Sequence, residues 1–297
     1  MKRFIIGIIA LFTVLSCGKN GTDGIYISVR NSCWQIAIEN QVAWPCFIGN
    51  DIASIVQVNY ELGAYQIMNG SYTVDGHRVR VAAESSVLMV RTMSNLKNSS
   101  NKNFTRLAPE APSSLEGTLW VSMRDYEFNF VYHGEGGEYL SGVFYNFARR
   151  EGLPYGWDWE VGTYAVNGSQ YVLEEENGTF YGDKFMVLDN LAIPRVHKAR
   201  SLTGTSSLKG TVWTLQQGSG YPGFILFTSA TEFVRVLVNS NIVFVVLEGT
   251  YTLKGNSLEL ETSAEELCRT CTIENGKFTY LQRTYALTDF TDSVVTP

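Results

Sequence analysis

The chain has 297 residues, of which 45% are hydrophobic and 18% are charged, and its formal net charge is -6 at pH 7. This is the composition of a folded protein, and the length leaves room for two or three domains. The acidic balance provides no basic excess to neutralise a phosphate backbone, which argues against nucleic acid as a partner.

The first seventeen residues, MKRFIIGIIALFTVLSC, have the pattern of an export signal. Lys2 and Arg3 precede an apolar run that is too short to span a bilayer as a stable helix. The segment VLSC at 14–17 resembles the lipobox of bacterial lipoproteins. The resemblance implies that Cys17 is acylated, becomes the mature N-terminus and holds the protein on a membrane; plain secretion with an incidental cysteine is the alternative.

The residues after Cys17 bear on location. The segment GKN at 18–20 has no acidic residue directly after the cysteine, which in the proteobacterial sorting scheme implies the outer membrane. The periplasmic face and the cell surface both remain open. No later segment reaches eighteen apolar residues, so we expect the mature protein to sit on the membrane without crossing it.

Two phrases recur along the chain. GSYTVDG at 70–76, GTYAVNG at 162–168 and GTYTLKG at 249–255 form one set, and SSLEGTLW at 113–120 and SSLKGTVW at 206–213 form the other. We expect a weaker opening in the first copy at Gly24-Ile25-Tyr26, with Tyr26 where the later copies have tryptophan. A shared period of about ninety residues predicts three copies of one small domain. The predicted boundaries are 18–107, 115–197 and 208–297, after the leader at 1–17.

Each copy is predicted to be made of short strands. The hairpin phrases alternate in hydrophobicity around a turn, with Asp75-Gly76, Asn167-Gly168 and Lys254-Gly255 expected at the two central positions of type I′ turns. No stretch has a convincing helical period, so the predicted fold is all-β, with three tandem antiparallel barrels or sandwiches. Further strands are expected at 126–132, 140–147, 224–227, 232–238 and 242–247. The seams at 107–114 and 198–207 are expected to be a semi-extended and a flexible linker.

The openings and the hairpin phrases together resemble the lipocalin-like and META-like β domains of bacterial outer-membrane lipoproteins. The resemblance covers most of residues 115–290. It implies a fold and a compartment, and it transfers no catalytic residue.

Four further cysteines give an even number in an exported chain, where disulfides are the default. Cys33 and Cys46 would close a fourteen-residue loop. In an extended strand Cys268 and Cys271 would lie about 10 Å apart, so a bond between them requires a turn. Structural disulfides are the favoured interpretation, with free thiols and a CxxC redox pair as alternatives, and zinc bound by all four is discounted.

The segment LPYGWDWE at 153–160 is the best candidate for a ligand site. On a strand, Trp157 and Trp159 would project to one face, and Asp158 and Glu160 to the other. Neighbouring indoles can stack on sugar rings, although tryptophans that fill the barrel interior are the favoured interpretation of this pair. The candidate ligand-binding residues are Tyr155, Trp157, Asp158 and Trp159.

No catalytic motif accompanies this segment. His77, His133 and His197 fall outside metal-ligand spacings, and no nucleophile elbow or phosphate loop is present. We therefore expect no catalytic residue, metal or cofactor. The predicted function is non-catalytic binding of a glycan, an apolar small molecule or an envelope protein; the alternatives are a structural adhesin or assembly subunit, and a thiol oxidoreductase or hydrolase.

Overall fold

A computed structural model of the chain describes residues 29–38, 41–59, 64–75, 78–83, 86–91, 104–124, 127–145, 156–173, 176–216, 223–239 and 243–288. Within these ranges the secondary structure is all β, apart from turns and two short 3-10 helices. Cys17, the expected opening at 24–26 and Tyr155 lie outside the described residues. The chain divides into two compact units, Met1–Asn59 with Ile67–Ala108 and Asn190–Ala192, and Tyr60–Gln66 with Pro109–Asp189 and Ile193–Pro297.

The first copy is a meander in which each strand pairs with its neighbour, in the order β7-β1-β2-β3-β4-β5-β6. Its core is built on Trp34, Phe47, Ile55, Tyr72 and Val81, all of them buried. The strands are β1 (Ser32–Ile38), β2 (Gln41–Ile48), β3 (Ile52–Asn59), β4 (Ala64–Asp75), β5 (Arg78–Ala83), β6 (Ser86–Arg91) and β7 (Thr105–Leu107).

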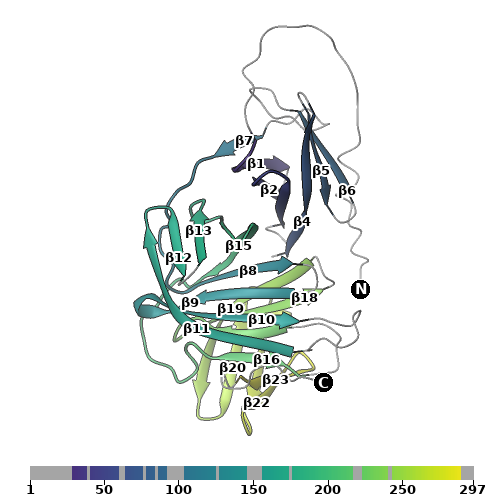
Figure 1. Cartoon of the computed structure of the whole chain (residues 1–297). Coiled ribbons are helices and arrows are strands. Elements are labelled where there is room, and N and C mark those ends of the chain that lie inside the picture. The colour runs from purple at the N-terminus through teal and green to yellow at the C-terminus, as the bar shows by residue number, and fades with distance from the viewer. Residues whose placement is uncertain are drawn as a thin grey trace. The chain divides into compact units, whose positions relative to one another are not determined.

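The second copy is a closed barrel in which β8 to β15 pair in sequence order and β15 returns to β8 (Figure 1). Its elements are β8 (Thr118–Arg124), β9 (Glu127–His133), the 3-10 helix η2 (Glu135–Gly137), β10 (Glu138–Tyr145), β11 (Gly156–Asn167), β12 (Gln170–Leu173), β13 (Glu176–Phe180), β14 (Phe185–Leu188) and β15 (Leu191–Lys198).

The third copy has the same strand order, with β23 beside β16, and no described ladder joins β21 to β22. The chain is therefore all-β with three tandem antiparallel β domains, as predicted. The elements of this copy are β16 (Val212–Leu215), β17 (Gly223–Phe227), β18 (Glu232–Asn239), β19 (Val243–Lys254), β20 (Ser257–Thr262), the 3-10 helix η3 (Glu265–Leu267), β21 (Arg269–Thr272), β22 (Lys277–Tyr280) and β23 (Arg283–Leu287).

The repeated hairpin phrases form the β4–β5, β11–β12 and β19–β20 hairpins. Their turns differ from the prediction, because Asn167 pairs with Gln170 and Lys254 pairs with Ser257. In these two hairpins the central residues are therefore 168–169 and 255–256, and the glycine comes first, with φ of 60° in both. Glycine at the first central position is typical of a type II′ turn, so the type I′ prediction was wrong for these two turns.

Each copy opens with the same buried relay of hydrogen bonds. In the second copy the Trp120 indole donates from Nε1 to the Thr118 hydroxyl at 2.8 Å, and that hydroxyl donates to the carbonyl of Leu115. Gly117, just before the threonine, has a φ of 72° that favours glycine. The relay gives the barrel-filling indole its hydrogen-bond partner without water.

The other two copies repeat this relay. In the third, Trp213 donates to Thr211 at 3.0 Å and Thr211 to Leu208 at 2.6 Å; in the first, Trp34 donates to Ser32 at 2.8 Å and Ser32 to Val29. The equivalent of Trp120 in the first copy is therefore Trp34, and the expected equivalence to Tyr26 was wrong. The error came from assuming a constant period, since the first interval between these tryptophans is seven residues shorter than the second.

We predict that Thr118→Val lowers the free energy of unfolding by about 2 kcal/mol, because the buried Trp120 N–H loses its acceptor while the side-chain shape is kept. Urea unfolding measures the change. Thr163→Val, at an exposed position of β11, is the control and should change stability by no more than about 0.5 kcal/mol. Equal midpoints for the two variants would contradict a structural role for the relay.

Candidate functional site

The second and third copies pack through the outer faces of their sheets. Phe130 of β9 stacks on Phe224 of β17 with ring centroids 4.4 Å apart and an interplanar angle of 29°, and Phe128 lies 6.3 Å from the same ring. Phe224 is fully buried. Figure 1 shows β8 to β11 lying across the strands of the third copy. This aromatic contact joins the two copies within one compact unit.

The interior of the second barrel is packed by other aromatic rings. The His133 ring lies 6.3 Å from Trp120, 4.7 Å from Tyr164 and 5.4 Å from Tyr171. Phe180 completes the group, 5.5 Å from the ring of Trp120. These side chains alternate along their strands with the outward-facing phenylalanines, so the interior and outer aromatic groups are separate.

His133 belongs to the packing of this interior and has no contact that would indicate catalysis. Its Nε2 lies 2.7 Å from the Tyr171 hydroxyl, and its Nδ1 lies 3.3 Å from the Thr118 hydroxyl. Burial lowers the pKa of His133 from 6.5 to about 3. The ring is therefore neutral at ordinary pH, as expected for an imidazole inside an apolar barrel.

The two candidate tryptophans lie together on the outer face of the second barrel. Trp157 and Trp159 of β11 stack with centroids 5.0 Å apart and an interplanar angle of 16°. Trp159 contacts Phe130 at 5.7 Å, and Trp157 contacts Phe224 at 5.8 Å. The pair therefore stands beside the contact with the third copy, outside the ring cluster of the barrel interior.

Both indoles remain partly exposed, as does Asp158 between them. The Asp158 carboxylate accepts the backbone N–H of Trp159 at 3.0 Å. Farther along the same face of β11, Val161 is 62% exposed. Trp157 and Trp159, with Phe128, Phe130 and Phe144 packed behind them, form a partly solvent-exposed surface that we call the aromatic platform.

The phenylalanines behind the platform were not singled out from the sequence. Their signal was present, since EFNFVYH at 127–133 alternates aromatic and smaller residues, and GFILF at 223–227 is apolar at every position. An unbroken apolar strand indicates burial on both faces. This pattern in β17 indicates that its outer face is covered, which is how the structure has it.

Polar contacts surround the aromatic contact between the copies. His197 of β15 lies 2.8 Å from the Glu248 carboxylate through Nδ1 and 3.0 Å from the Thr228 hydroxyl through Nε2. The Tyr132 hydroxyl donates to the carbonyl of Thr228 at 2.9 Å. Residues from β9 and β15 thus meet the turn after β17 and the middle of β19 in a fixed geometry.

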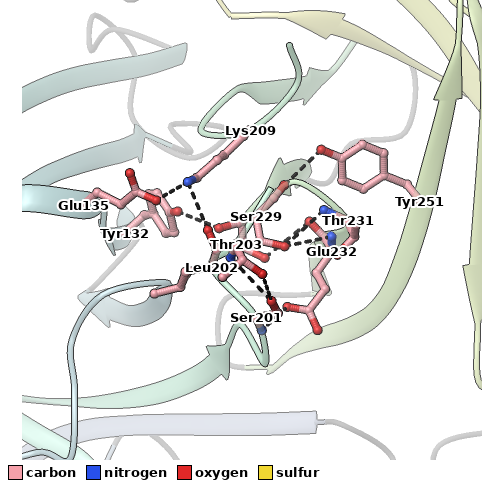
Figure 2. A network of polar contacts seen from close by, with 11 residues as sticks. Tyr132, Glu135, Ser201, Leu202, Thr203, Lys209, Ser229, Thr231, Glu232 and Tyr251 are labelled. Atoms are coloured by element: carbon pink, nitrogen blue, oxygen red, sulfur yellow. Dashed lines mark hydrogen bonds and ion pairs between the residues drawn. The ribbon is translucent and has the colours of Figure 1, made fainter. Parts of the chain in front are cut away.

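The segment 198–207 was predicted to be flexible, and the structure contradicts this. The Glu232 carboxylate accepts the backbone N–H of Arg200 at 2.7 Å. Figure 2 shows Lys209 reaching Glu135 on one side and the carbonyl of Leu202 on the other. The bond to Glu232 ties the start of the segment to β18, and the bond from Lys209 holds the carbonyl of Leu202.

The four predicted disulfide cysteines are thiols in the structure. Cys33 and Cys46 are both buried and stand directly opposite each other on β1 and β2. Cys271 is buried in the core of the third copy, whereas the sulfur of Cys268 lies against the backbone of Thr262. Burial raises the pKa of the Cys46 and Cys271 thiols. Disulfide formation stays a prediction.

The described residues contain no group of three or more histidine, cysteine or acidic side chains placed to hold a metal ion. Nor do they include a helix with the length and apolar character that crossing a bilayer requires.

No family model and no curated protein matches the chain. Among solved structures, it is similar over 91% of its length to 93% of a Pseudomonas aeruginosa DNA polymerase sliding clamp, with 7% identity and a TM-score of 0.14. It is also similar over 92% of its length to 94% of a Caulobacter crescentus pol III beta structure, with 8% identity and a TM-score of 0.13. TM-scores this low carry no argument about fold or function.

Proposed function

We propose that the protein is a bacterial envelope lipoprotein, anchored by acylated Cys17, that binds a glycan on the aromatic platform without transforming it. The observation that carries this proposal is the stacked pair of Trp157 and Trp159 on the outer face of the second barrel, partly exposed and backed by other rings. Aromatic faces held on strands offer a sugar ring a surface that needs no rearrangement to bind.

The packing of the barrel supports a glycan over an apolar molecule held inside. The interior rings of Trp120, His133, Tyr171 and Phe180 contact one another where such a ligand would sit. Asp158 and Glu160 project to the other face of β11, and Glu160 accepts a hydrogen bond from the Tyr139 hydroxyl, so the platform itself presents the indoles. Indole faces suit the apolar face of a sugar ring.

The state of the thiols supports a non-catalytic role. A redox cysteine works as a thiolate, and its pKa is lowered by its surroundings. Cys271 of the CxxC segment is buried in the core of the third copy, and burial raises the pKa of its thiol. The thiol oxidoreductase alternative has no support from this environment.

The anchor proposal rests on the lipobox resemblance at 14–17 and places the protein on the outer membrane, on either face. We expect the full chain, expressed with its leader in a diderm bacterium, to fractionate with membranes and to carry acyl chains on Cys17 by mass spectrometry. Cys17→Ser should release it from the membrane fraction, because the lipid supplies the membrane affinity. Recovery of the variant in membranes at the level of the unmodified chain would contradict the anchor.

We predict that soluble envelope glycans quench the tryptophan fluorescence of the protein, and that Trp159→Ala weakens the binding at least about tenfold. Aromatic stacking worth about 1.4 kcal/mol accounts for a tenfold loss. Trp159 is the better position for the test, because Trp157 also contacts Phe224 of the third copy. Fluorescence titration measures the dissociation constants.

Trp159→Phe is the matched control, because it keeps a ring against Phe130 and should retain most of the affinity. Circular dichroism and the unfolding midpoint check that both variants keep the fold. A response to fatty acids in place of glycans would replace the glycan with an apolar ligand. A lack of response to a broad glycan panel, or equal binding by Trp159→Ala, would contradict the proposal.

A further inference from the structure

The third copy buries a guanidinium in its interior. Arg235 of β18 is 8% exposed, and its Nε donates to the Tyr285 hydroxyl at 2.8 Å. Its guanidinium carbon lies 5.5 Å from the centre of the Tyr280 ring. Both tyrosines are fully buried. The arginine is therefore held in place by two aromatic residues from β22 and β23.

The strand register places this side chain inside the barrel. Arg235 pairs with Ile225 on β17 and with Leu247 on β19, both of which pack in the interior core. Its neighbours Val234 and Val236 lie on the other side of β18, the side of Phe224, which pairs with Val236. The guanidinium thus points away from the second copy, into its own barrel.

The fold does not require an arginine at this position. In the second copy Ser141 occupies the equivalent position, because Ser141 pairs with Glu160 on β11 as Arg235 pairs with Leu247 on β19. In the first copy the position belongs to Ile55. The carbonyl of Asp51 accepts the N–H of Tyr72, just as the carbonyl of Thr231 accepts the N–H of Tyr251 in the third copy. Ile55 lies four residues after Asp51, as Arg235 lies four residues after Thr231. An apolar or a small side chain therefore serves in the other two barrels.

No anionic group of the described chain neutralises this arginine. Arg235 forms no ion pair there, and of its nitrogens only Nε makes a hydrogen bond to a described residue. A guanidinium stays charged at any ordinary pH, and holding it in a barrel interior without a counter-charge is unfavourable. Contact with a tyrosine ring and one hydroxyl offsets only part of that cost.

We propose that the third barrel binds an oxyanion, a carboxylate or a phosphate group, through the terminal nitrogens of Arg235. The planar fork of the guanidinium matches two oxygens of either group. The Tyr285 hydroxyl fixes the orientation of the fork through Nε, and the Tyr280 ring supports one face of it. This site is separate from the aromatic platform, so either can fail without the other.

The test is thermal unfolding of the mature protein in sodium phosphate, sodium acetate and sodium chloride at equal ionic strength. We expect phosphate or acetate to raise the unfolding midpoint above its value in chloride by at least about 3 °C, because an oxyanion that binds only the folded state stabilises it. A rise in phosphate alone assigns a phosphate ligand, and a rise in acetate assigns a carboxylate.

Arg235→Met should abolish this rise and should unfold in chloride at or above the wild-type midpoint, because it removes an uncompensated buried charge and keeps the apolar stem. Arg235→Lys, which keeps the charge but loses the fork, should fold and show a reduced rise. Arg269→Gln, at an exposed position of β21, is the matched control and should respond as the wild type does.

Two results would overturn the proposal. One is a wild-type midpoint that is the same in all three salts. The other is an unchanged rise in Arg235→Met or, if that variant does not fold, in Arg235→Lys. Either result would assign Arg235 to the packing of Tyr280 and Tyr285 alone.

Discussion

The stacking of Phe130 on Phe224 is the contact on which the arrangement of the second and third copies depends. It joins strands β9 and β17, which are nearly a hundred residues apart in the sequence, and it buries the outer face of each sheet at that point. A barrel whose outer face is aromatic needs such a cover, because leaving these rings in water would cost about 2 kcal/mol for each large side chain. The contacts of His197 and of Glu232 surround this apolar centre and become possible only when the two faces meet.

The same contact shapes the proposed binding face. The aromatic residues of β9 and β11 form one continuous outer surface, of which the third copy covers the part beside Trp157. Trp159 packs against Phe130, and Phe130 in turn stacks on Phe224, so the exposed part of the surface is rigid. A rigid aromatic surface binds with little loss of side-chain freedom. The buried Arg235 has a different chemistry on the opposite side of the third sheet, and the two proposed sites therefore call for different ligands.

The sequence predicted the all-β fold and its repeats because both follow from local patterns, the alternation of apolar and polar residues and the recurring phrases. The hairpin phrases around Gly168 and Gly255 predict strands and turns, although the position of each glycine within its turn depends on the pairing register. The first opening was misplaced because Asn31 and Ser32 stand where the other copies have glycine and threonine, leaving only the hydroxyl and the indole in common. The ordered segment after Lys198 and the cover on Phe130 could not be predicted, since both depend on partners distant in the chain.

Hydrogen–deuterium exchange of the full chain with Phe224→Ala tests most directly whether the second and third copies are one packed unit. Removing this ring creates a cavity against Phe128 and Phe130 and should destabilise the contact by about 3 to 5 kcal/mol. The account predicts faster exchange of backbone amides in β9 to β11 of the second barrel as well as in β17 of the third. Faster exchange confined to β16–β23, with β9 to β11 protected as in the unmodified chain, would contradict it.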